Sequence, residues 1–342
     1  MSTAKPETVS LADGAGDTAM KLILAPMEGL ADDVLRGVLT GAGGYDWCVT
    51  EFVRVTDAVL PHRCYTRLSP ELARGARTKA GTPVRIQLLG NDPDMLAANA
   101  AHLARLNPFG IDLNFGCPTP LVVRHRGGAA LLDEPELLHR IAAAVRAAVP
   151  REMPVTAKMR LGVDDTSKAL DCALALESGG VNELVVHART KADGYQPIRR
   201  WEWVARIRAT VKLPLIANGE VWTVADWHAI RAASGCDDVM LGRGAVADPL
   251  LARRIRGNAE AEPNDGDWRE IETMLAKFWE RVERKVLPAQ SPGRLKQWLG
   301  LMQRRYPQAE RLFQTLREAR RGPELGALLQ REGVIAASRE AA

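Results

Sequence analysis

The sequence predicts an α/β fold: a closed (β/α)₈ barrel (the TIM barrel) followed by a small all-α helical bundle. Two observations predict it. From residue 21 to about 257, eight short apolar runs alternate with longer amphipathic patterns, and from residue 268 on only helical patterns follow. Alternating strands and helices imply parallel pairing, because parallel strands need a crossover. Eight such units in about 230 residues favour a closed barrel over an open doubly wound sheet, which stays as the alternative.

The expected strands are short apolar runs of the length that buried parallel strands have. They lie at 21–25, 46–50, 84–88, 110–114, 155–159, 183–187, 213–218 and 237–241. Ala- and Leu-rich amphipathic segments between them predict helices. The clearest of these are 93–106, 135–148, 167–178 and 223–234.

Four segments are expected along the chain. Residues 1–20 read as a disordered leader outside the fold, and 21–257 as the barrel domain. Residues 258–267, NAEAEPNDGD, are polar with Pro and Gly and predict a linker, and 268–335 predict the helical domain. The expected helices of that domain, separated by prolines, are 268–286, 294–305, 308–320 and 323–332.

The charge of the chain is concentrated in this helical tail. Between Arg281 and Arg321 stand eleven Lys and Arg and three acidic residues, a net charge of +8. The total of +4 leaves −4 for the rest. Such asymmetry favours a surface that binds a polyanion such as nucleic acid, with a solvated helix face as the plain alternative.

Composition excludes several classes of protein. With 46% hydrophobic and 26% charged residues among 342, the chain is neither collagen-like nor mainly disordered. No uncharged apolar run approaches the ~18 residues of a membrane helix, and the first twenty residues lack the apolar core of a signal peptide. The five cysteines form no C-x-x-C pair. We therefore expect a cytoplasmic protein with reduced thiols and no membrane, metal or obligatory protein partner.

A polar residue or a glycine stands at the end of nearly every expected strand. Since catalytic groups of such barrels lie at the carboxyl ends of the strands, these residues are expected to share one site. Taken strand by strand, they are Pro26-Met27-Glu28, Thr50-Glu51, Gln87, Asn114 with Cys117, Lys158 with Arg160, His187 with Arg189, Asn218-Gly219-Glu220, and Gly242-Arg243-Gly244.

The turns after strands seven and eight both carry glycine, at Gly219 and Gly242. In barrels these two loops often hold a phosphate, which backbone N–H groups can approach closely at glycine and which Arg243 would complement in charge. Ordinary tight turns are the alternative.

Lys158 lies within an expected buried strand and would point into the barrel mouth. A buried lysine needs an anionic partner or a neutral state. The edge of a flavin ring that becomes negative on reduction meets this need, and the amide of Gln87 can satisfy ring donors and acceptors. A structural ion pair with a carboxylate such as Glu220 is the alternative for Lys158.

Cys117 follows a strand in the turn N-F-G-C-P, which presents its thiol at the mouth. A neutral thiol with a pKa near ~8.5 is a competent general acid at pH 7. A buried apolar role suits Cys48, Cys172 and Cys236 better. His187 can donate a hydrogen bond to a phosphate or ring edge, or be a satisfied core histidine.

Together, these motifs resemble the tRNA-dihydrouridine synthase family. The resemblance runs from about residue 21 to 320 in the family's order and spacing, and its form is most similar to the bacterial C-type branch, which modifies uridine 16 of the tRNA D-loop. The segments that carry it are APMEG (25–29), TEFVRV (50–55), QLLG (87–90), DLNFGCP (112–118), AKMRLG (157–162), VVHART (185–190), IANGE (216–220), MLGRGA (240–245) and RLKQWL (294–299).

The resemblance implies bound FMN, NADPH as a transient reductant, and a helical domain that binds tRNA. It implies that Cys117 donates the proton to C5 after hydride transfer from flavin N5 to C6, with Asn114 near the target base. The residues implied to hold FMN are Pro26, Met27, Glu28, Gln87, Lys158, His187, Asn218, Gly219, Glu220, Gly242 and Arg243. Those implied to meet the tRNA are Arg54, Tyr195, Arg294, Lys296 and Arg317.

Two other functions remain to be weighed. A flavin-dependent dehydrogenase of a free pyrimidine, similar to the dihydroorotate dehydrogenases, would also place an Asn/Cys loop after a strand, but a small substrate needs no domain of charge +8. A non-catalytic RNA-binding protein would explain the basic tail but not the polar residues at the strand ends.

Overall fold

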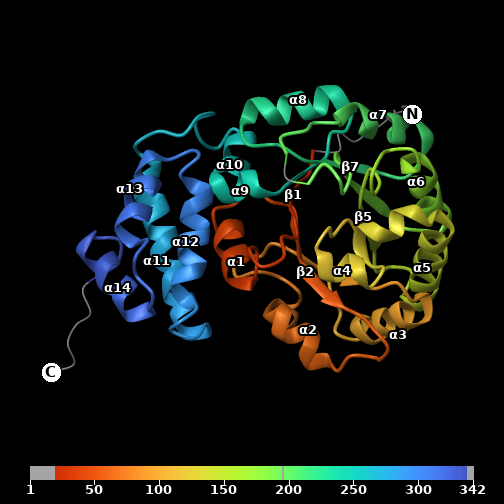
Figure 1. The fold of residues 1–342 in the computed structure, drawn as a ribbon, viewed down its shortest axis with the longest axis horizontal. Helices are drawn as coiled ribbons and strands as arrows, with labels where there is room; N and C mark the ends of the chain where they lie inside the picture. The colour runs from red at the N-terminus through yellow and green to blue at the C-terminus, as the bar shows by residue number, and fades with distance from the viewer. Residues whose placement is uncertain (1–19, 195, 337–342) are drawn as a thin grey trace, which may run out of the picture.

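All eight expected strands form, and they close into a single parallel barrel in sequence order, so the open-sheet alternative is wrong (Figure 1). The structure is a computed structural model that describes residues 20–194 and 196–336. The strands are β1 Leu22–Leu24, β2 Trp47–Arg54, β3 Val84–Leu89, β4 Ile111–Phe115, β5 Val155–Arg160, β6 Glu183–His187, β7 Leu215–Asn218 and β8 Val239–Leu241.

Helices surround this barrel and continue beyond it. Those of the barrel are α1 Asp33–Gly41, α2 His62–Leu68, α3 Pro93–Ala104, α4 Pro120–Arg124, α5 Pro135–Ala148, α6 Ala169–Ser178, α7 Trp201–Thr210, α8 Val224–Ser234, α9 Arg243–Ala247 and α10 Leu251–Ile255, with the 3₁₀ helices η1 Pro70–Arg74 and η2 Gly128–Asp133. The helices that follow are α11 Asp267–Lys285, α12 Ser291–Met302, α13 Pro307–Leu316 and α14 Gly322–Arg331.

Side-chain caps fix where several barrel helices begin. Asp32 accepts from the N–H groups of the first turn of α1, and Asp92 accepts from Met95 N at 2.9 Å at the start of α3. At α8, Thr223 and Asp226 form a reciprocal capping box. These caps satisfy N–H groups that have no partner within the helix, so the loops before α1, α3 and α8 have defined ends.

Strand β2 is longer than its apolar run. The sequence places its end at Thr50, whereas the strand continues to Arg54. Its pairing with β3 shifts in register between Val49 and Phe52. The run 46–50 shows only the apolar part, because the strand goes on through the half-buried Glu51 and Phe52 at the mouth.

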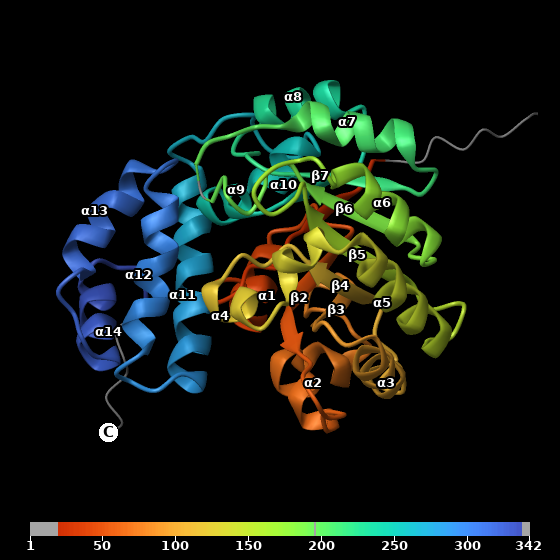
Figure 2. The ribbon, with the colours of Figure 1, turned by 45° about the vertical axis from the view of Figure 1, so that its right-hand side comes forward.

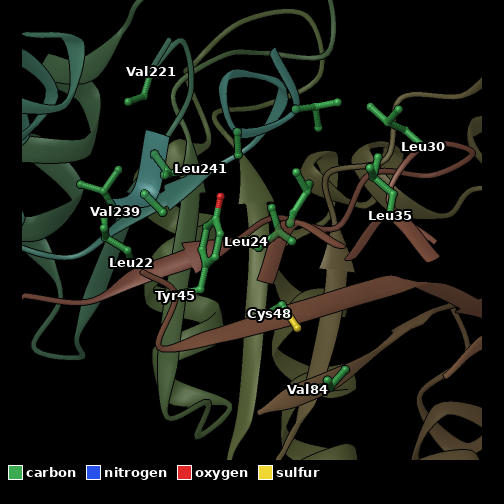
Figure 3. Packing of buried hydrophobic residues seen from close by; sticks show 14 of the residues in the cluster. Leu22, Leu24, Leu30, Leu35, Tyr45, Cys48, Val84, Val221, Val239 and Leu241 are labelled. Carbon is green, nitrogen blue, oxygen red and sulfur yellow. The ribbon is translucent and has the colours of Figure 1, made fainter. Parts of the chain in front are cut away.

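The barrel interior is filled at one end and polar at the other. Inward-facing apolar side chains, including Ile23, Val185 and Ile216, form one compact cluster. The larger core lies between strands and helices, where Figure 3 shows Cys48 among buried aliphatic side chains. Cys48, like Cys172 and Cys236, is buried, as the sequence predicts for cysteines outside the site.

The four final helices pack against one side of the barrel, with α11 on α1 and α12 on α9 (Figure 2). Helix α12 begins at Ser291, earlier than the expected residue 294. Pro292 stands in its first turn, where the missing N–H would have no helical partner. Proline therefore begins this helix instead of preceding it.

A buried network joins the barrel to these helices. Arg254 Nε donates to Asp248 at 2.8 Å, and its Nη2 donates to Asp267, the first residue of α11, at 2.5 Å. Tyr306 OH donates to Asp248 at 2.7 Å. The side chains of Arg254 and Asp248 are fully buried. The junction between the barrel and α11 is therefore held by buried charged groups, each of which would be left without its partner if another were removed.

The described residues contain no helix that is both long and apolar enough to cross a membrane.

We predict that Arg254→Leu lowers the free energy of unfolding by about 3–5 kcal/mol, because it leaves Asp248 buried without its cation. The neighbouring Arg253 pairs with Glu270 where both are partly exposed, so Arg253→Leu is the matched control, with an expected cost of about 0–1 kcal/mol. Urea denaturation measures both. Equal costs for the two variants would show that the buried network does not hold the junction.

Candidate active site

A cavity of about 360 Å³ opens at the carboxyl ends of the strands. It brings together every residue that the sequence analysis assigns to the flavin, the proton donor and the target base. These are Pro26, Met27, Glu28, Gln87, Asn114, Cys117, Lys158, His187, Asn218, Gly219, Glu220, Gly242 and Arg243. The rule that strand ends share one site in a barrel is thereby confirmed for all of them.

Glu220, in the loop after β7, is an ion-pair centre. Its Oε1 lies 2.6 Å from Arg189 Nη2 and 3.0 Å from Arg243 Nη2, and its Oε2 accepts from Trp222 Nε1 at 3.2 Å. The alternative in which Glu220 pairs with Lys158 is therefore wrong. Two arginines already pair with this carboxylate: Arg189 holds the loop after β7 to the loop after β6, and Arg243 holds it to the segment after β8.

The half of the mouth formed by β5 to β8 has an excess of positive charge. Burial and the neighbouring Arg160 lower the pKa of Lys158 to about 7, although Asp112 opposes the shift. Burial, followed by the charges of Lys158 and the surrounding arginines, lowers the pKa of His187 well below its usual value. His187 is thus a neutral imidazole at pH 7. Two carboxylates, Glu220 and Asp112, balance only part of the charge of the lysine and three arginines there, so the region suits an anionic ligand.

Gln87 is fully buried, and its amide belongs to an internal network. Its Nε2 donates to Asp112 Oδ2 at 2.7 Å, and its Oε1 accepts from Asn114 Nδ2 at 2.7 Å. The sequence analysis missed Asp112 as part of the site. The signal was present, because Asp112 and Asn114 stand two residues apart on β4 and share a face.

Cys117 lies in the turn after β4 with its thiol held between two oxygen atoms. Sγ is 3.2 Å from Thr119 Oγ1 and 3.7 Å from Glu28 Oε2. Burial raises the pKa of the Cys117 thiol, and the charge of Glu28 acts in the same direction. The group is therefore a neutral thiol at pH 7, which is the state that a proton donor needs. The sequence analysis did not predict its contact with Thr119.

Four residues expected to meet RNA, Arg54, Arg294, Lys296 and Arg317, do not line this cavity. Arg54 lines a neighbouring cavity of about 340 Å³. Arg294 donates to Gly29 O and pairs with Asp32, and Lys296 donates to the carbonyl of Arg317 at 2.7 Å. Arg294 and Lys296 thus each have a hydrogen-bond partner within the protein.

Arg317 and Tyr195 are the other two residues expected at the RNA surface. Arg317 pairs with its exposed neighbour Glu318 at 3.2 Å. Tyr195 lies outside the described residues.

The helical domain reaches the cavity at two points that the sequence analysis missed. Gln297 of α12 lines the cavity. Arg304, beyond the end of α12, lies over the ring of Trp222 at 4.2 Å from its centroid, and Arg243 lies over the same ring at 5.3 Å. Spacing alone does not show such contacts, since they depend on how the domain packs on the barrel.

Among residues 20–194 and 196–336, no group of three or more His, Cys, Asp or Glu side chains is arranged to hold a metal ion.

Comparisons with known proteins show the family of this chain. Residues 23–322 match the family model described as dihydrouridine synthase (Dus). Proteins named tRNA-dihydrouridine(16) synthase from Cupriavidus necator and Aquipseudomonas alcaligenes are 55% and 56% identical over 91% and 87% of this chain, and the matches cover 96% and 95% of those proteins. A protein of the same name from Neisseria meningitidis serogroup B is 47% identical over 90% of this chain and 93% of its own.

Among solved structures, an old yellow enzyme homologue from Zymomonas mobilis has a TM-score of 0.49 at 12% identity, over 72% of this chain and 92% of that chain. The assignment rests on the sequence matches, which span the barrel and most of the helical domain. The chain belongs to the dihydrouridine synthase family.

Proposed function

We propose that this enzyme reduces uridine 16 in the D-loop of tRNA to 5,6-dihydrouridine in the cytoplasm, with FMN bound in the barrel mouth and NADPH as the reductant. The observation that carries the proposal is one cavity that contains both a neutral thiol and an excess of cations. The names of relatives that match nearly the whole chain supply the substrate position.

The residues present fit a phosphorylated flavin. Within the described residues Lys158 Nζ has no hydrogen-bond or ion-pair partner, although the side chain lies in the barrel mouth. The ring edge at N1 and C2=O, which becomes negative on reduction, supplies the anion that this amine lacks. At the other end, a Cβ on Gly242 would point into open space, so the backbone is accessible to phosphate oxygens there, and Arg243 supplies charge.

The reaction has a hydride-transfer step and a proton-transfer step, and different groups in the mouth serve each of them. When bound, FMN supplies the hydride for C6 of the uracil ring. Cys117 then gives its thiol proton to C5: the S–H bond breaks, a C–H bond forms, and the thiolate regains a proton from solvent. Lys158 and nearby donors stabilise the negative charge that develops on the ring before this proton arrives.

The helical domain accounts for the size of the substrate. The segment from Arg281 to Arg321 carries a net charge of +8, which suits contacts with phosphates along folded RNA. A base inside a tRNA loop must leave its stack to reach a cavity in the protein, and such contacts hold the RNA while it does so. Gln297 belongs both to this domain and to the wall of the cavity.

The direct test uses purified protein with NADPH and two tRNA transcripts, one with U16 and one with C16 and all other uridines unchanged. We expect dihydrouridine in the first transcript only. Product in both would retain the chemistry and overturn the position. Reduction of orotate in place of tRNA would support the free-pyrimidine alternative.

We predict that Cys117→Ala keeps its flavin and its reduction by NADPH but loses about 10²–10⁴-fold in turnover on tRNA, because general acid catalysis contributes that much. Cys64→Ala is the matched control, since Cys64 is partly buried and does not line the cavity, and we expect near wild-type turnover. Stopped-flow spectra and dihydrouridine yield measure the two half-reactions. Full turnover by Cys117→Ala would remove its role as proton donor.

We predict that, above pH 7, the reduction potential of bound FMN falls more steeply with pH in wild type than in Lys158→Met. Lys158 is a cation below its pKa of about 7 and neutral above it, so stabilising the negative charge of the reduced ring edge at higher pH requires the uptake of a proton by Lys158. Lys158→Met lacks this group but shares every titration of FMN itself. Spectroelectrochemical titration between pH 6 and 9 measures both, and parallel curves would exclude Lys158 as the titrating group.

A further inference from the structure

A chain of side-chain hydrogen bonds runs from the middle of the barrel to the cysteine turn. It starts at Asp112, whose Oδ1 accepts from Thr156 Oγ1 at 2.6 Å and whose Oδ2 accepts from Gln87 Nε2 at 2.7 Å. Gln87 Oε1 accepts from Asn114 Nδ2 at 2.7 Å. Asn114 Oδ1 then accepts from the backbone N–H groups of Gly116 and Cys117 at 3.0 and 2.9 Å.

The direction of the chain is set at its two ends, by the carboxylate of Asp112 and by the two N–H donors of the turn. The amides of Gln87 and Asn114 each have a donor end and an acceptor end, and both orientations fill the same space. An ionised carboxylate can only accept. Asp112 therefore draws the NH₂ group of Gln87, which turns the oxygen of Gln87 toward Asn114, which in turn aims the oxygen of Asn114 at the turn.

Burial makes the wrong direction costly. Gln87 is fully buried, and Asp112 and Thr156 are each 1% exposed, so water does not replace a lost partner. If Asn114 were reversed, its NH₂ group would face two N–H donors and leave them unsatisfied. Burial raises the pKa of Asp112, and the hydrogen bonds from Thr156 and Gln87, together with the positive charges of Arg85 and Lys158, oppose this rise.

The carbonyl groups of the turn have other partners. Gly116 O accepts from Arg160 Nε at 2.8 Å, and Cys117 O accepts from Ala129 N at 3.0 Å. Only the two N–H groups depend on Asn114, and through it on Asp112. A change at Asp112 should therefore be seen first at those two amides.

We propose that Asp112 is a positioning residue: its buried carboxylate fixes the direction of the Gln87–Asn114 chain and thereby holds the turn that carries the Cys117 thiol. The structural part of this proposal stands without any assigned reaction. Only its effect on turnover rests on the function proposed above.

Hydrogen exchange of the Gly116 and Cys117 amides, followed by mass spectrometry on the purified holoenzyme, tests the structural part. We expect about tenfold faster exchange in Asp112→Asn, because an amide at 112 no longer imposes one direction on the chain. Thr156→Val is the matched control. It removes a hydrogen bond to the same carboxylate but not the one to Gln87, so exchange should stay within about twofold of wild type. Unchanged exchange in Asp112→Asn would overturn the proposal.

A double variant tests direction itself. Asp112→Asn combined with Asn114→Asp moves the carboxylate to the other end of the chain and reverses Gln87. The carboxylate at 114 again accepts from the Gly116 and Cys117 amides, so we expect wild-type protection to return. Exchange at least as fast as in Asp112→Asn would contradict the proposal. If Asp112→Asn does not fold, Gln87→Met interrupts the same chain and carries the same expectation of faster exchange.

Half-reaction kinetics test the consequence for catalysis. In Asp112→Asn we expect reduction by NADPH within about twofold of wild type and turnover on tRNA lowered roughly 10²-fold in kcat, since a displaced proton donor affects only the second step. Equal losses in both half-reactions would indicate general damage and overturn the positioning role. If wild type makes no dihydrouridine while the exchange results hold, the proposed function fails and the positioning role remains.

Discussion

The ion pairs of Glu220 with Arg189 and Arg243 are the interaction on which the active site depends. A closed parallel barrel brings the carboxyl ends of all its strands to one mouth, and here that mouth collects cations from β5 to β8. Cations gathered in one cavity repel one another unless an anion lies between them. Glu220 joins the loops after β7 and β8, and it leaves a positive potential that a phosphorylated cofactor can use.

The part of the mouth at the ends of β3 and β4 is ordered by hydrogen bonds instead of ion pairs. From β3 and β4 come neutral amides and a thiol, ordered by hydrogen bonds that begin at the buried Asp112. Cations at close range would lower the pKa of the thiol and turn it into a nucleophile. Its burial and the nearby Glu28 keep Cys117 protonated. The fold thus places a group that stabilises negative charge and a group that supplies a proton in one cavity, at the ends of the neighbouring strands β5 and β4.

The sequence was sufficient for the strands and for the strand-end residues of the cavity, because strand ends in a barrel meet at one place whatever the loops do. The sequence was not sufficient to predict which charged side chains form ion pairs. Glu220 faces Arg189 and Arg243 instead of Lys158, and that choice depends on the geometry of two loops in space. Asp112 lay inside an expected strand, where its role appears only once the neighbouring strand brings Gln87 beside it. The charge count of the tail likewise did not show that Arg294 bonds to the backbone of the barrel.

The most direct measurement is a map of dihydrouridine across the D-loop of tRNA from cells that lack this gene, with and without a plasmid copy. Our account predicts that dihydrouridine disappears at position 16 alone and returns with the wild-type copy. Persistence of dihydrouridine at position 16 in the deleted strain would contradict it.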